Sequence, residues 1–284
     1  MKKFLSLLLA LTLALSLAAC GTSNTPAADR SGSASGDDAE PITLVVFAAA
    51  SMTETLTEIA GNYKTVAPNV TLCFNFDSSG KLLTQIEEGA LCDLFISAAP
   101  KQMNALDGSL KDDAEKNPNG QDMLLEGSRL NLLENKVTLA VPEGNPKGIE
   151  SFDQLAELLK NGEVMLAIGN SDVPVGQYTQ KIFAYYGIDE TSITDKLTYG
   201  NNVKEVTTQV TEAAADCGII YATDAFSAGL TTVDSATAEM CGQVIYPAAV
   251  LKDGQTEAAQ AFLDYLRTEE AMAVFQSVGF SPAN

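Results

Sequence analysis

Two short stretches of this chain have the residue types and spacing to bind an anion through helix ends. In the first, an apolar run over residues 42–47 passes through Ala48-Ala49-Ala50 to Ser51, and helical spacing begins directly afterwards. The second, Phe76-Asp77-Ser78-Ser79-Gly80-Lys81-Leu82, repeats this order of strand, small polar residues and helix. Such a corner directs backbone N–H groups and a hydroxyl to one point, which suits an anion. The pattern predicts a binding site made of helix ends.

Ser51 also fits a purely structural role. It stands where a helix N-cap is expected, and Glu54 follows three positions later, so the pair predicts a capping box. Capping and ligand binding are compatible, because both use groups at the start of the helix.

Catalytic chemistry has little support in the composition. The chain has no histidine, which excludes the Ser-His-Asp triad and the Cys-His dyad and removes the commonest transition-metal ligand. Ser78-Ser79-Gly80-Lys81 matches the S-x-x-K pattern of penicillin-interactive enzymes, but the companion K-T-G motif is missing. A serine enzyme that uses Ser78 and Lys81 therefore stays as a minor alternative, and we predict no catalytic residue.

The charge balance is strongly acidic. The chain has 17 basic and 37 acidic residues, a formal net charge of −20. Without Lys2 and Lys3 of the predicted signal the balance becomes 15 − 37 = −22. No basic cluster stands out, so nucleic acid is not an expected partner. An anion would be bound through local dipoles, since salt screens charges beyond about 8–10 Å.

The N-terminus carries a targeting signal. Met1-Lys2-Lys3 is basic, and residues 4–19 are apolar but shorter than the roughly 20 residues of a membrane span. Leu17-Ala18-Ala19-Cys20-Gly21 resembles the lipobox of bacterial lipoproteins, which implies that Cys20 is lipid-modified after cleavage. An ordinary secretory signal is the alternative. We expect residues 1–20 to be the signal peptide and residues 21–40, rich in Gly, Ser, Thr, Ala and Asp, to be a flexible tether.

Four cysteines remain after Cys20. A location outside the cytoplasm would permit disulfides, in three alternative pairings. Cys73, Cys92 and Cys217 lie in or beside predicted strands, which favours free, small apolar side chains over bridges.

Apolar runs and helical spacing alternate along the rest of the chain. The predicted strands are 42–47, 70–76, 94–98, 136–141, 164–168, 217–221 and 244–250. This order predicts an α/β fold with mostly parallel sheets covered on both faces. Ligands of such sheets bind beyond the carboxyl ends of the strands. Ser51, Ser79, Val175 and Val203 all lie just after strands or at helix starts.

A series of motifs in a fixed order resembles the molybdate-binding proteins of molybdate ABC importers, over about residues 42 to 280. The motifs are Phe47-Ala48-Ala49-Ala50-Ser51, Asp77-Ser78-Ser79-Gly80-Lys81-Leu82, Asp93-Leu94-Phe95-Ile96-Ser97-Ala98, Val173-Pro174-Val175-Gly176-Gln177-Tyr178, Gly218-Ile219-Ile220-Tyr221-Ala222-Thr223-Asp224-Ala225 and Tyr246-Pro247-Ala248. The resemblance implies a periplasmic-binding-protein-like fold of type II. Its two α/β lobes would be 41–137 with 223–284, and 138–222, joined by hinge strands near 136–141 and 218–221.

The resemblance also implies a ligand site. A tetrahedral oxyanion, molybdate or tungstate, would be held by the Ser51 and Ser79 hydroxyls, the Val175 and Val203 main-chain N–H groups and the Tyr221 hydroxyl. No cofactor and no direct protein–metal ligand is expected, because molybdenum would enter as its oxyanion. Asp77 adjoins this site and is expected to point away. A carboxylate can accept a hydrogen bond from a protonated oxyanion. Phosphate therefore remains an alternative ligand because of Asp77.

The expected function is therefore binding of molybdate, and of tungstate, outside the cytoplasmic membrane by a monomeric lipid-anchored protein. It would deliver the anion to an ABC permease and its ATPase and would not be an enzyme. The alternatives are a binding protein of the same fold for sulfate, phosphate or another small anion, and a surface adhesion lipoprotein with a vestigial cleft.

Overall fold

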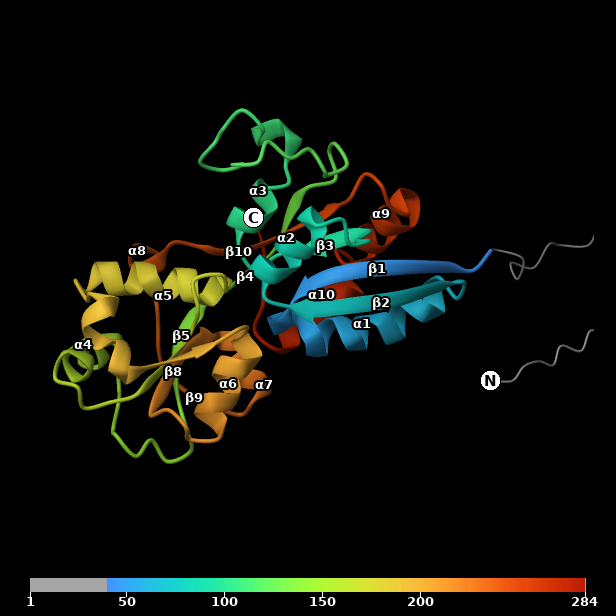
Figure 1. Cartoon of the computed structure of the whole chain (residues 1–284). Helices are drawn as coiled ribbons and strands as arrows, with labels where there is room; N and C mark the ends of the chain where they lie inside the picture. The colour runs from blue at the N-terminus through green and yellow to red at the C-terminus, as the bar shows by residue number, and fades with distance from the viewer. Residues whose placement is uncertain (1–39, 284) are drawn as a thin grey trace, which may run out of the picture. The chain divides into compact units, whose positions relative to one another are not determined.

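The computed structural model describes residues 40–283, which form two β-sheets with helices against them (Figure 1). The predicted signal peptide, the lipidation site Cys20 and nearly all of the tether lie outside the described residues. The two sheets and their helices confirm the predicted α/β class.

The first sheet has six strands in the order β11-β4-β10-β3-β1-β2. Its strands are β1 (Ile42–Ala49), β2 (Val70–Asp77), β3 (Leu94–Ile96), β4 (Leu130–Asn135), β10 (Val244–Val250) and β11 (Ser281–Pro282). β1 lies between β2 and β3, parallel to both, and its near-continuous apolar sequence is what a strand covered on both faces requires. β10 and β4 run antiparallel to their neighbours.

The longer helices cover this sheet because each buries an apolar stripe. In α1, Leu56, Ile59 and Tyr63 recur at helical spacing and are buried. Figure 1 shows α1 lying along β1 and β2. The helices of this part are η1 (Ala50–Met52), α1 (Thr53–Val66), α2 (Ser79–Glu87), α3 (Pro100–Asn104), η2 (Gly108–Leu110), α9 (Thr256–Tyr265) and α10 (Glu269–Ser277).

The second sheet has five strands in the order β7-β6-β8-β5-β9. Its strands are β5 (Val137–Val141), β6 (Leu166–Gly169), β7 (Leu197–Gly200), β8 (Cys217–Tyr221) and β9 (Thr231–Ser235). The helices between them are α4 (Phe152–Lys160), α5 (Pro174–Tyr185), η3 (Glu190–Lys196), α6 (Val203–Thr211) and α7 (Ala222–Ser227), and α8 (Ala238–Cys241) follows β9. β6 is parallel to β7 and β8, whereas β5 is antiparallel to β8 and β9. Both sheets are thus mixed, and the prediction of mostly parallel sheets is wrong.

The chain crosses between the sheets twice. It leaves the first sheet at Lys136, between β4 and β5, and returns through residues 236–243, between β9 and β10. The sequence placed the second crossing near residues 218–221 and residues 223–284 in the first lobe, whereas β9 pairs with β5 in the second sheet. β9 is a polar, largely exposed edge strand, so it lacks the alternation that would have revealed it.

The described part of the chain contains no disulfide: Cys73 is exposed, and Cys92, Cys217 and Cys241 are buried free thiols. Among residues 40–283, no helix has both the length and the apolar character needed to cross a membrane.

Candidate functional site

A small cavity brings together all of the predicted ligand residues. Its empty volume is ≈ 200 Å³. It is lined by Ala49, Ala50, Ser51, Asp77, Ser78, Ser79, Ala98, Val173, Pro174, Val175, Val203 and Tyr221. The lining combines ends of β1, β2 and β3 in the first sheet with the starts of α5 and α6 and the end of β8 in the second.

Ser51 lies in η1, the short turn between β1 and α1, and does not cap α1. The N-cap position belongs to Met52, and no side-chain cap bond is made there. The capping-box prediction for Ser51 and Glu54 is therefore wrong. The Ser51 hydroxyl instead lies 2.9 Å from the hydroxyl of Tyr246 in β10. This tertiary contact spans 195 positions, so local sequence could not reveal it.

Ser79 is the first residue of α2, and Ser78 before it is the N-cap. The Ser78 hydroxyl accepts a hydrogen bond from the Lys81 N–H at 3.3 Å. The Ser79 hydroxyl accepts one from the Ala98 N–H at 3.0 Å, which leaves its own proton free for a further acceptor. The Ser79 N–H also has no acceptor within the helix, because it belongs to the first turn. Ser79 can thus donate two hydrogen bonds.

Val175 and Val203 lie in the first turns of two helices of the second sheet. Val175 follows Pro174 at the start of α5, and Val203 begins α6 after Asn202, whose side chain accepts from the Glu205 N–H. The N–H groups of a first turn have no intrahelical acceptor and carry the positive end of the helix dipole. The side chains of both valines are buried, so the main chain supplies the polar groups here.

Tyr221 ends β8 and is almost wholly buried, at 1% exposure. Its hydroxyl has no hydrogen-bond partner among the described residues. Burial raises the pKa of Tyr221 well above its ordinary value, so the phenol keeps its proton and can donate it. An unsatisfied buried hydroxyl costs about 1–3 kcal/mol, which a bound acceptor would recover.

The lining of this cavity, as far as residues 40–283 describe it, includes no lysine or arginine. Asp77 is its one ionisable carboxylate, and the Asp77 Oδ1 atom is already engaged. It accepts from the Ser78 N–H at 2.7 Å and from the Asn202 side chain at 3.3 Å, and Lys81 Nζ lies 3.5 Å away. The cavity is therefore lined mainly by uncharged groups. The Asp77 carboxylate is partly engaged by the N-terminus of α2, which follows it in the chain.

Elements of the two sheets also contact each other through residues that neighbour the cavity lining. Lys204 of α6 lies 2.7 Å from a carboxylate oxygen of Glu54 in α1 and 3.2 Å from Asp224. Burial raises the pKa of Asp224 to about 6, against the opposing effect of Lys204. Gly80 approaches the main-chain oxygen of Asp172 so closely that a Cβ atom on Gly80 would overlap it. Elements of the two sheets are thus in direct contact near the cavity.

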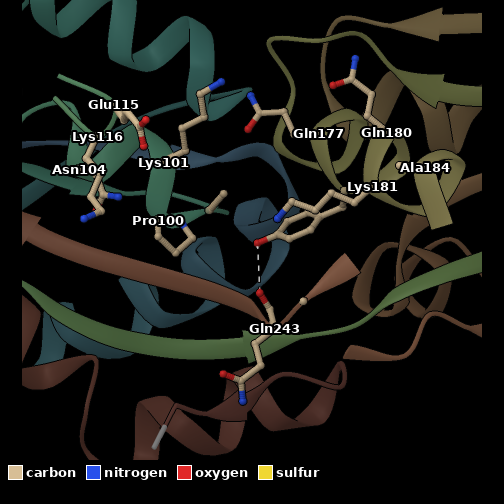
Figure 2. Close-up of a pocket in the computed structure, with 13 residues that line it drawn as sticks. Pro100, Lys101, Asn104, Glu115, Lys116, Gln177, Gln180, Lys181, Ala184 and Gln243 are labelled. Atoms are coloured by element: carbon tan, nitrogen blue, oxygen red, sulfur yellow. Dashed lines mark hydrogen bonds between the residues drawn. The ribbon is translucent and has the colours of Figure 1, made fainter. Parts of the chain in front are cut away.

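A second, larger pocket lies beside the first, between α3 and α5 (Figure 2). Its empty volume is ≈ 1280 Å³, and Lys101, Lys116 and Lys181 stand at its border. Lys116 already pairs with Asp113 at 2.8 Å. Lys181 Nζ lies 5.1 Å above the ring of Tyr178, whose hydroxyl donates to the Gln243 carbonyl.

Comparison with known proteins decides the family. Residues 44–281 match the model of the bacterial extracellular solute-binding proteins. The chain belongs to this family. Its fold is the type II periplasmic-binding-protein fold, which its structural neighbours share.

Three similar proteins illustrate the relationship. YvgL of Bacillus subtilis, provisionally named as an ABC transporter substrate-binding lipoprotein, is 33% identical over 99% of this chain and 98% of its own length. The molybdate-binding protein ModA of Haemophilus influenzae is 33% identical over 84% of this chain and 89% of its own. The periplasmic molybdate-binding protein of Azotobacter vinelandii superposes with a TM-score of 0.68, covering 85% of this chain and 100% of that protein. At 22% identity, this last likeness concerns the fold alone.

Proposed function

We propose that this protein binds molybdate, and tungstate as its close chemical analogue, in the small cavity lined by Ser51, Ser79, Val175, Val203 and Tyr221. One observation carries the proposal: the Tyr221 hydroxyl is buried without a partner beside helix starts whose N–H groups also lack acceptors. An ion with several acceptor oxygens would satisfy all of these donors together.

The chemistry of the donors suits a fully deprotonated tetrahedral dianion. Such an ion can only accept hydrogen bonds, and hydroxyls and helix N-termini can supply them without a counter-cation. Each bond to a charged partner contributes about 1.5–3 kcal/mol. Several of them could reach micromolar affinity, about −8 kcal/mol, after the cost of ordering the site and the ion.

The relatives support molybdate over other anions. The Haemophilus protein of 33% identity is named for molybdate binding, and its similarity extends over 84% of this chain. Phosphate remains the main competitor, because Asp77 borders the cavity and could accept its proton. The engagement of Asp77 Oδ1 by Ser78 and Asn202 argues against that use.

We further propose that the protein acts outside the cytoplasmic membrane, tethered through a lipid on Cys20, and passes its ligand to an ABC permease driven by an ATPase. The name of the Bacillus relative as a lipoprotein supports the anchor. The two sheets with their helices would act as two lobes, hinged at Lys136 and at residues 236–243, that close on the ion. The function needs no covalent chemistry, and Ser78, which serves as a helix cap, is not proposed as a nucleophile.

Calorimetric titration of the purified domain with molybdate, tungstate, sulfate and phosphate tests this function. We expect tight binding of molybdate and tungstate, and weak or absent heat with sulfate and phosphate. Strong binding of phosphate or sulfate with no heat from molybdate would overturn the specificity. No binding of any of the four would favour a vestigial cleft.

A further inference from the structure

A buried chain of polar side chains leads from the first crossing between the sheets to Ser51. Asn135 is the last residue of β4, directly before the crossing at Lys136. Its Nδ2 atom donates to Thr223 Oγ1 at 2.9 Å and to the Tyr246 hydroxyl at 3.2 Å. The Tyr246 hydroxyl lies 2.9 Å from Ser51 Oγ. All four residues are buried.

The orientation of the Asn135 side-chain amide is fixed by the hydrogen bond that its oxygen accepts. Asn135 Oδ1 accepts a hydrogen bond from the Lys136 N–H at 2.8 Å. The end of the amide that faces Tyr246 is therefore the NH₂ group, which can only donate hydrogen bonds. Tyr246 must accept from Asn135 through its oxygen.

The proton of Tyr246 then has one acceptor within hydrogen-bond distance among the described residues, the Ser51 oxygen. The phenol stays protonated, since burial raises the pKa of Tyr246 well above its ordinary value. If Ser51 donated to Tyr246 instead, the Tyr246 proton would be buried without an acceptor, at a cost of about 1–3 kcal/mol. Tyr246 therefore donates to Ser51, and the Ser51 proton is left to point elsewhere.

We infer that Asn135 and Tyr246 are positioning residues that orient the Ser51 hydroxyl as a donor into the ligand cavity. Ser51 lines that cavity, and no other hydrogen bond of its hydroxyl is present among residues 40–283. Neither Asn135 nor Tyr246 lines the cavity, so both act through Ser51. The inference rests on the proposed function and explains how one of its hydroxyls is preset for a ligand that carries no proton.

The consequence is a preference for unprotonated anions. A serine free to rotate could donate to molybdate or accept a proton from hydrogen phosphate. A serine whose oxygen is already occupied by the Tyr246 proton offers only its own proton. Removing the Tyr246 hydroxyl should therefore weaken molybdate binding more than phosphate binding.

The test is calorimetry with molybdate and with inorganic phosphate on wild type, Tyr246→Phe, Asn135→Ala, Ser51→Ala and the Tyr246→Phe/Ser51→Ala double variant. We expect Tyr246→Phe to lower molybdate affinity roughly tenfold, the loss of about one hydrogen bond. The ratio of molybdate to phosphate affinity should fall at least about threefold. In the Ser51→Ala background, Tyr246→Phe should have little further effect, because its target is gone.

Tyr265→Phe is the matched control, since Tyr265 is a buried phenol of α9 that does not line the cavity. Thermal unfolding checks that each variant is folded, and Asn135→Ala tests the same chain of bonds if Tyr246→Phe does not fold. The inference would be overturned if the wild type binds molybdate and both Tyr246→Phe and Asn135→Ala bind it with the same affinity as the wild type. Additive losses in the double variant would also overturn it, since they indicate a merely structural role. Absence of any oxyanion binding by the wild type is a different result, which defeats the proposed function and the inference together.

Discussion

The two neighbouring pockets differ in a way that is instructive about anion binding. The larger one is bordered by three exposed lysines, whereas the small one has no cation in its described lining. A search for positive charge alone would choose the larger pocket. Its lysines are exposed side chains, and Lys116 and Lys181 are already engaged with Asp113 and Tyr178. The small cavity has a buried donor without a partner, the Tyr221 hydroxyl, which a charge count does not register.

Under the proposed function, fixed dipoles at a buried site matter more than mobile charges on exposed side chains. Dipoles of buried helix starts act in a medium of low dielectric and are already oriented before the ligand arrives. The field of exposed lysines is screened by salt beyond about 8–10 Å. On this proposal, a protein with a formal net charge of −20 binds a dianion through local dipoles.

The largest effect is expected from removing both serine hydroxyls of the small cavity. Each should contribute about 1.5–3 kcal/mol to a charged ligand, so Ser51→Ala/Ser79→Ala should weaken molybdate binding by more than about 100-fold. Calorimetry measures this loss. Retention of affinity within about threefold would contradict the role of the cavity.

Preventing closure should have the next largest effect. A methyl group at Gly80 would overlap the Asp172 carbonyl, so Gly80→Ala should hold the two sheets apart and lower affinity at least about tenfold. Gly61→Ala is the control, since a Cβ there meets nothing within 4 Å. Small-angle scattering with saturating molybdate should show compaction in the control and not in Gly80→Ala. Equal compaction in both would count against a role of the Gly80–Asp172 contact in closure.

Substitutions at position 203 can distinguish the contribution of the Val203 N–H group to binding from that of the Val203 side chain. Val203 is the first residue of α6, where proline is well tolerated, and Asn202 before it is already extended, as a residue before proline prefers. Val203→Pro removes the N–H and should lower affinity roughly tenfold. Val203→Ala keeps the N–H and should change affinity by less than about threefold. Similar losses in both variants would assign the effect to the side chain.

The smallest effect is expected from the lysines of the larger pocket. Lys101→Gln/Lys181→Gln should change equilibrium affinity by less than about threefold at physiological salt, because exposed charges are screened. Lys64→Gln/Lys111→Gln, two exposed lysines outside both pockets, is the matched control. A loss of tenfold or more in the first pair alone would move the binding site to the larger pocket.

The parts of the fold that were predictable are those where local pattern and tertiary environment agree. β1, β8 and β10 are apolar runs because they are buried, and their positions follow from the sequence. β9 was not predicted, because an exposed polar edge strand is defined by its pairing with β5. The second crossing was misplaced for the same reason, whereas the first lies at Lys136, as expected.

The site shows a similar division. The small residues after β1 and β2 and the polar starts of α2 and α6 indicate helix ends in the sequence, and the structure brings the five predicted residues to one cavity. The partner of Ser51 could not be predicted, because Tyr246 is 195 positions away and reaches it only through the pairing of strands in the first sheet. Asn135 shares this difficulty, since its partners are 88 and 111 positions away.

A crystal structure of the protein grown with molybdate, with the molybdenum located by its anomalous scattering, tests the central proposal most directly. The expected result is one strong peak in the small cavity, within hydrogen-bonding reach of Ser51, Ser79, the Val175 and Val203 N–H groups and Tyr221. A peak beside Lys101 and Lys181 in the larger pocket, with the small cavity empty, would contradict it.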